Sequence, residues 1–221
     1  MVQPQARSIG LSPEDTYSAL RDAIVTGKLQ PNERLVEADL AQSLGAGRAA
    51  IRTALVRLEQ ERLVERERNR GARVRMVSVQ EAVEILEARS VLEALIASRA
   101  AERVTAEDAA ALRADLAELR DRLECGDLLG ASDANAAFHR RILAIARHET
   151  AERLISSLHS QMVRFQYRTI LIPGRSANSL EEHAAIADAI LGGDPPAAEQ
   201  AMRRHLSNVA EALRASAAAA A

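Results

Sequence analysis

Tryptophan is absent from this chain of 221 residues, and phenylalanine and tyrosine occur only twice each. Hydrophobic residues nevertheless make up 48% of the chain, so any core must be built mainly from alanine, leucine, isoleucine and valine. Small and aliphatic side chains favour helices that pack closely against one another. The chain is long enough for two modest domains, each with a core of its own, and we expect two.

Cysteine is almost absent as well. The single residue, Cys125, excludes a disulfide within the chain and a zinc site made of thiolates from one chain. No apolar run approaches the roughly 20 residues that a membrane-spanning helix needs. The N-terminal residues also lack the apolar segment of a signal peptide. We therefore expect a cytoplasmic protein with no membrane partner.

The formal net charge is only -2, but the charges are unevenly distributed. Between Arg48 and Arg75 there are nine arginines against four glutamates, and nine minus four leaves a local balance of plus five. A basic segment in an otherwise acidic chain is typical of a surface that binds phosphates. A solvated helix and strand with internal ion pairs would have the same composition, and charge alone does not separate the two interpretations.

The first third of the chain has the pattern of three helices followed by a β-hairpin. We place the helices from Ser12 to Gly27, at about 36–44 and at about 48–61. Alternating residues on both sides of Asn69, Arg70 and Gly71 predict the hairpin. Helix, helix, turn, helix and hairpin is the order of a winged helix-turn-helix. We predict such a DNA-binding domain over residues 11–77, after a disordered leader over residues 1–10.

From Ser78 onward the sequence has no further strand pattern and predicts about six helices. We place them at about 79–102, 105–125, 127–147, 149–171, 176–192 and 195–216. The expected fold is therefore mainly α: an N-terminal winged helix-turn-helix with a small β-hairpin, and a C-terminal all-α bundle over residues 78–216. Residues 217–221 are expected to form a tail.

The histidines of the second domain suggest a metal site. All five lie after residue 138, and His139, His183 and His205 each fall on the apolar stripe of a different predicted helix. One inward histidine is usually a hydrogen-bonded core residue, but three in one small bundle leave several imidazole nitrogens to satisfy. Ligation of one metal ion would satisfy them together. Ordinary core histidines are the alternative.

The stretch TYSALRDAIVTGKLQPNERLVEADLAQSLGAGRAAIRTALVRLEQERLVERERNRGARV resembles the DNA-binding domain of GntR-type regulators. The submotifs LRDAIVTGKLQPNERL, EADLAQSLG, RAAIRTALVRLE, RLV and NRGARV occur in the family's order. With its helical remainder, the chain is similar over nearly its whole length to the FadR branch, which has a C-terminal effector (FCD) domain. The six-helix count resembles the VanR-type subdivision.

This resemblance implies that the third helix enters the major groove at its N-terminal end. There the planar fork of an arginine can bind guanine or phosphate. The DNA-binding residues that it implies are Arg34, Arg48, Arg52, Arg57, Asn69, Arg70 and Gly71. For Arg52 and Arg57 the alternative is an ion pair with Glu59 or Glu61. Gly47 and Ala49 stand where the family usually has Ser or Thr, so two hydroxyl contacts to phosphate are missing.

Effector domains of the FadR branch often bind a divalent metal through a carboxylate one helical turn before a histidine, and through two later histidines. The matching histidines are His139, His183 and His205, but Asn135 stands where the carboxylate would be. Its amide oxygen brings no charge and would be a weak fourth ligand. The resemblance implies Zn, Ni or Mn as the metal.

An open position on such a metal would suit the carboxylate of a small organic acid effector. The residues expected near this effector are Arg89, His159, Gln161 and Arg164. For Arg89, an ion pair with Glu93 on the same helix is an equally good explanation.

Together these features predict a ligand-responsive transcription regulator, repressor or activator, that binds a palindromic operator as a homodimer. One alternative is a constitutive DNA-binding dimer without metal or effector. The other is a metal-dependent hydrolase or lyase. The enzyme alternative lacks support, because the sequence contains no HExxH motif, no Gly-rich phosphate loop and no nucleophile elbow. We therefore expect no enzymatic activity.

Overall fold

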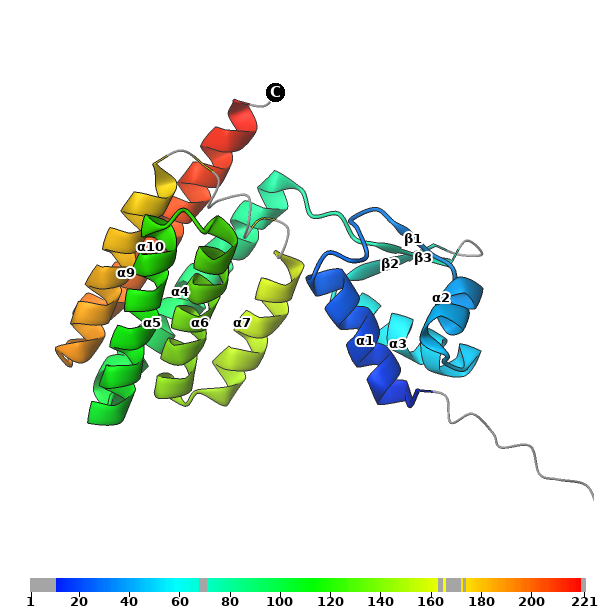
Figure 1. Ribbon diagram of the computed structural model, residues 1–221, viewed down its shortest axis with the longest axis horizontal. Coiled ribbons are helices and arrows are strands. Elements are labelled where there is room, and N and C mark those ends of the chain that lie inside the picture. Colours follow the sequence, from blue (N-terminus) through cyan, green and yellow to red (C-terminus); the bar gives the residue numbers. More distant parts are fainter. Residues whose placement is uncertain (1–10, 68–70, 163–164, 166–171, 173, 220–221) are drawn as a thin grey trace, which may run out of the picture. The chain divides into compact units, whose positions relative to one another are not determined.

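A computed structural model of the chain describes residues 11–67, 71–162, 165, 172 and 174–219 (Figure 1). Within these residues the fold is mainly helical, with one small antiparallel sheet. The chain divides into two compact units, with the boundary in the sequence between Met76 and Val77. None of the described helices is long and apolar enough to cross a membrane.

The N-terminal unit has the expected winged helix-turn-helix order. Its elements are α1 (Pro13–Val25), β1 (Arg34–Leu35), α2 (Glu37–Leu44), α3 (Arg48–Gln60), β2 (Val64–Glu67) and β3 (Gly71–Val74). The hydroxyl of Ser12 caps α1 by accepting a hydrogen bond from the Asp15 N–H, and Pro13 takes the first helical position. Gly45 ends α2 in the left-handed conformation, which produces the turn before α3.

The sheet has three strands in the order β1-β3-β2, one more than the hairpin that the sequence predicts. The added strand β1 has only two residues, too few for an alternating pattern, and pairs Leu35 with Ala72 of β3. Gly71 has a φ of 88°, and a Cβ there would lie 3.0 Å from the Leu35 carbonyl oxygen. Close pairing with β1 therefore favours glycine at this position. Asn69 and Arg70 lie outside the described residues.

Buried aliphatic side chains form the core of the N-terminal unit. The helices contribute Leu20 of α1 and Ile51, Leu55 and Leu58 of α3, and the sheet contributes Leu35, Val64 and Val74. The apolar stripe of α3 thus faces α1 and the sheet. Arg48 and Arg52 lie on the part of α3 that is left to solvent, whereas Arg57 is half-buried.

The C-terminal unit is a bundle of helices. The described helices are α4 (Val79–Arg103), α5 (Ala106–Glu124), α6 (Leu128–Ala146), α7 (Glu149–Gln161), α9 (Arg175–Leu191) and α10 (Pro195–Ala218). The expected helix over 149–171 is too long, because the backbone leaves α7 at Met162. Ser78 and Thr105 cap α4 and α5, the second through a full capping box with Asp108.

Helix α4 lies at the centre of the bundle and contacts α6, α7, α9 and α10 (Figure 1). The core around it contains Leu86 and Ile96 of α4, Phe138 and Ile142 of α6, and Ile186 of α9, all almost fully buried. Helices α6, α9 and α10 all contact α4, so inward-pointing residues of these three helices can lie close to one another next to α4. This is where the three predicted histidines lie.

Candidate metal centre and nucleic-acid interface

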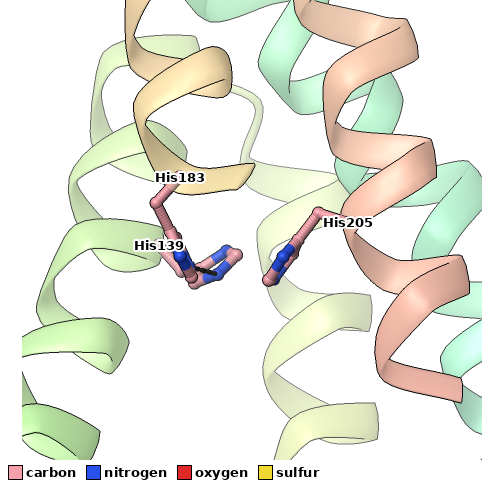
Figure 2. Close-up of side chains that lie close together, drawn as sticks. All are labelled: His139, His183 and His205. Carbon is pink, nitrogen blue, oxygen red and sulfur yellow. Dashed lines mark hydrogen bonds between the residues drawn. The ribbon is translucent and has the colours of Figure 1, made fainter. Parts of the chain in front are cut away.

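His139 of α6, His183 of α9 and His205 of α10 converge in the bundle, as Figure 2 shows. One ligand atom from each ring lies within 4.8 Å of the other two. The Nε2 atoms of His139 and His183 are 3.2 Å apart. His183 and His205 are buried, and the side chain of His139 is 15% exposed. The structure thus brings together the three histidines that the sequence places on separate helices.

The Nδ1 atoms of these rings face hydrogen-bond acceptors. His183 Nδ1 donates to the backbone carbonyl of Ser179. His205 Nδ1 lies 2.7 Å from Glu182 Oε2. His139 Nδ1 lies 3.3 Å from Glu93 Oε2, an ion-pair distance without the angle of a good hydrogen bond. Since a carbonyl or carboxylate oxygen only accepts, these hydrogen bonds assign the proton of His183 and of His205 to Nδ1, whereas His139 Nδ1 has no hydrogen-bond partner among the described residues.

This arrangement fits a metal ion. With its proton on Nδ1, His183 directs an Nε2 lone pair toward His139 Nε2, and a cation between the two rings could bind both nitrogens. Two imidazole nitrogens about 2.0 Å from a tetrahedral zinc ion lie about 3.3 Å apart, close to the 3.2 Å between His139 and His183. Burial lowers the pKa of His205 to about 4 and that of His183 well below its usual value, so both rings are neutral at neutral pH.

Two buried carboxylates stand behind the histidines, and sequence reasoning gave neither of them a role in this centre. Burial by itself raises the pKa of Glu93, but Arg89 and His139 outweigh it and hold the pKa well below its usual range. Burial likewise opposes ionisation of Glu182, while His205 and Asn208 lower its pKa. Both glutamates are therefore ionised in the protein interior.

A signal for both glutamates was present in the sequence. Glu93 lies seven residues after Leu86 on the buried stripe of α4, and Glu182 lies one turn before Ile186 on that of α9. An acid at a core position needs a buried partner. The pair of Arg89 with Glu93, considered from spacing alone, is present, with Nε 2.7 Å from Oε1.

The remaining residues predicted around the metal or effector divide into three groups. Asn135 lies one turn before His139 and is half-buried, and its side chain makes no hydrogen bond to the described part of the chain. Arg89 lies near the centre through its pair with Glu93. Burial, and after it the charge of Arg89, lowers the pKa of His159 to about 4. Gln161 donates to the Ser157 carbonyl at the end of α7, and Arg164 lies outside the described residues.

Three of the predicted DNA-binding arginines are exposed on the N-terminal unit. Arg48 is the first residue of α3, and Arg34 begins β1. Arg52 lies one turn after Arg48, where its Nε donates to Glu37 Oε2 at 2.7 Å. The partner is thus on α2, not the Glu59 or Glu61 considered from spacing. The side chain of Arg52 is still 66% exposed.

Arg57 connects α3 to α1. Its guanidinium pairs with Glu14 and lies 3.7 Å from the ring centroid of Tyr17. The Tyr17 hydroxyl in turn donates to Glu61, which also pairs with Arg21. Neither glutamate considered as a partner for Arg57 is the one it contacts in the structure. Its role in DNA binding stays a prediction.

Comparison with known proteins finds one family match in each of the two structural units. The family of bacterial regulatory proteins called gntR matches residues 13–74, and the FCD domain matches residues 84–208. The HTH-type transcriptional repressor GlaR of Escherichia coli K12 is 31% identical over 201 residues, covering 87% of this chain and 91% of GlaR. The HTH-type transcriptional regulator LutR of Bacillus subtilis 168 is 30% identical, covering 86% of this chain and 95% of LutR.

Among solved structures, E. coli McbR/YncC has the same fold, with a TM-score of 0.77 at 22% identity, over 93% of this chain and 99% of that one. The two family matches together define a two-domain transcription regulator, with a helix-turn-helix domain followed by a helical domain. The chain belongs to the GntR family of regulators and carries a C-terminal FCD domain.

Proposed function

We propose that this protein is a transcriptional repressor that binds a palindromic operator as a homodimer and responds to a small organic acid at a metal centre. The convergence of one ring nitrogen from each of three histidines, with an oxygen atom near each Nδ1, carries the effector part of the proposal. The family carries the DNA-binding part. Membership of the FadR branch and of its VanR-type subdivision stays a prediction.

Arg48 and Arg34 are the best candidates for DNA contacts. Both are exposed, and Arg48 begins the helix that enters the major groove in a helix-turn-helix. Arg52 can join them by exchanging its exposed pair with Glu37 for a phosphate, because such a surface pair is weak. Two copies of α3 in a symmetric dimer would read the two halves of a palindrome.

The all-imidazole inner shell favours zinc or nickel over manganese, because manganese prefers oxygen ligands. His139, His183 and His205 would hold the ion, with Asn135 on the same face of α6 as a weak fourth ligand. The bound ion would act as a Lewis acid that attracts a carboxylate to its open position. Arg89 and His159 lie close enough to the centre to influence which acid binds.

A DNA-binding experiment tests the first part of the proposal. An operator is first recovered by selecting random duplexes that the full-length protein retains, and its affinity is then measured by fluorescence anisotropy. Arg48→Ala should weaken binding by roughly 5- to 150-fold, because one well-placed arginine contact is worth about 1–3 kcal/mol. Arg113→Ala, which removes an exposed arginine of α5, is the matched control and should bind like the native protein. Equal affinity of Arg48→Ala and the native protein would refute the assignment.

An effector screen tests the second part. The full-length protein is freed of metal with a chelator, reloaded with Zn²⁺, and melted in the presence of small carboxylic acids. A hit should raise the melting temperature of the loaded protein only, and should change its operator affinity, since effector and DNA binding are thermodynamically linked. Operator binding that is unaffected by metal and by every acid would favour the constitutive dimer.

A further inference from the structure

Behind two of the three clustered histidines lies a buried series of side chains, in which an arginine contacts a glutamate and the glutamate contacts the imidazole. In the first series, Arg89 Nε lies 2.7 Å from Glu93 Oε1, and Glu93 Oε2 lies 3.3 Å from His139 Nδ1. The second series has the same order on other helices: Arg175 Nη2 lies 2.8 Å from Glu182 Oε2, which lies 2.7 Å from His205 Nδ1. The same three residue types thus stand in the same order on two sides of one cluster.

We propose that Glu93 and Glu182 are positioning residues for the metal centre. Each holds its histidine as the Nδ1–H tautomer with Nε2 directed inward, and each supplies the negative charge near the ion that Asn135 cannot. The inference rests on the metal binding proposed above, and it assigns a role to two residues outside the ligand set.

Burial makes the two carboxylates effective. Glu93 is 3% exposed and Glu182 is 9% exposed, so water does not screen their charge from the imidazoles. An ionised carboxylate cannot donate a hydrogen bond, so the contact of Glu182 with His205 Nδ1 excludes the opposite tautomer of that ring, and Glu93 favours the same tautomer of His139 through its charge. The same contact raises the basicity of Nε2 and so strengthens its bond to a metal.

The arginines hold the carboxylates in place. The two oxygens of Glu93 are divided between Arg89 and His139. The Glu182 side chain is held at both oxygens, since Asn208 Nδ2 donates to Oε1 at 2.8 Å. Glu182 cannot rotate away without losing buried hydrogen bonds at both oxygens, so His205 keeps its orientation in the metal-free protein. Glu93 is held through its hydrogen bond from Arg89.

His183 provides an internal contrast. Its Nδ1 donates to the neutral backbone carbonyl of Ser179, which orients the ring but adds no charge. The ion would therefore be held by three imidazoles. A carboxylate faces the Nδ1 side of His139 and of His205, and only a neutral carbonyl faces that of His183. Loss of either carboxylate should weaken binding without removing a ligand.

Zinc affinity is the main test, measured on the full-length protein by competition with a chelating dye. Glu93→Gln and Glu182→Gln should each weaken Zn²⁺ binding by about 10- to 100-fold, the usual effect of losing an outer partner of a metal-bound histidine. The controls are Glu87→Gln, an exposed glutamate of α4 paired with Arg214, and Glu181→Gln, the exposed neighbour of Glu182. Both controls should bind Zn²⁺ like the native protein.

Two further measurements separate positioning from a loss of structure. The visible spectrum of the Co²⁺-loaded protein should shift in Glu93→Gln and Glu182→Gln and not in the controls. In the metal-free native protein, long-range ¹H–¹⁵N NMR correlations should show His139 and His205 as Nδ1–H tautomers. The tautomer measurement needs no variant, so it applies even where a variant does not fold.

The outcomes distinguish this inference from the function on which it rests. A native protein that binds neither Zn²⁺ nor Ni²⁺ refutes the proposed metal centre, and the tautomers then still decide whether the carboxylates orient the two rings. A native protein that binds Zn²⁺, with unchanged affinity in Glu93→Gln and Glu182→Gln, overturns the inference alone. Nε2–H tautomers at His139 and His205 in the metal-free protein overturn it as well.

Discussion

Removing and restoring the metal should change the thermal stability of the C-terminal unit by a predictable amount. The histidines come from α6, α9 and α10, so an ion held by all of them connects three helices that must separate on unfolding. Ligands that bind only the folded state stabilise it by an amount set by their concentration relative to Kd. At a free Zn²⁺ concentration of about 100 times Kd, the gain is about 2.7 kcal/mol.

The size of the C-terminal unit converts this free energy into a temperature. Val77–Ala221 contains 145 residues, since 221 − 77 + 1 = 145, and for domains of about this size 1 kcal/mol shifts Tm by roughly 2–4 °C. We therefore expect the melting temperature to rise by roughly 5–10 °C when Zn²⁺ is added to chelator-treated protein. Weakening Kd by about 100-fold would leave only about 0.4 kcal/mol at the same zinc concentration, which is a shift of about 1 °C.

Differential scanning calorimetry with zinc buffered at a fixed free concentration is the assay. His139→Gln removes one ligand from the most exposed position of the cluster and should lose almost the whole shift. His148→Asn is the matched control, because asparagine preserves the cap of α7 and His148 lies outside the cluster. The reasoning fails if native protein gains no stability from Zn²⁺ or Ni²⁺, or if His139→Gln gains as much as the native protein.

Three further predictions concern the core, the pH dependence and the sheet. Phe138 is fully buried, with its ring edge-on to His139, so Phe138→Ala should lower the free energy of unfolding of the C-terminal unit by about 3–5 kcal/mol in urea titrations; a loss below about 1 kcal/mol would contradict this packing. Burial lowers the pKa of His159 to about 4, below the value of about 6.5 in an unfolded chain, so its stabilising effect is complete above about pH 6.5 and is lost as the pH falls towards about 4. Between about pH 7 and about pH 5, metal-free native protein should therefore lose about 2 kcal/mol more stability than His159→Gln, and parallel losses would refute the assignment. Gly71→Ala should destabilise the N-terminal unit by about 1–2 kcal/mol, because its φ of 88° is strained for alanine and the new Cβ would lie 3.0 Å from the Leu35 oxygen; thermal melts unchanged from the native protein would show that β1 gives way.

Local patterns in the sequence were sufficient to predict most of the elements. Ser12, Gly45 and Thr105 mark helix ends through interactions with their near neighbours in the chain, which a sequence displays directly. The apolar stripes likewise predicted that His139, His183 and His205 point inward. Strand β1 was missed because two residues have no periodicity, and only its pairing with β3 defines it.

The predicted partners of charged side chains were less reliable, because a sequence reveals only neighbours within one helix. Arg57 was considered with Glu59 and Glu61, but the packing of α3 against α1 brings Glu14 to it instead. Arg52 finds its partner on α2 for the same reason. An ion pair between elements depends on how the helices cross, which spacing along one helix does not contain.

By itself, the sequence determined the order of the elements, the helix that carries the basic face, and which histidines are buried, because these depend on periodicity and on contacts between near neighbours. Tertiary structure decided that the three imidazoles meet, and that Glu93 and Glu182 stand behind two of them. The physical reason is that the distance between atoms on different helices is set by the packing of whole helix faces. A carboxylate at a core position signals that a partner exists, and only the packed bundle shows which one.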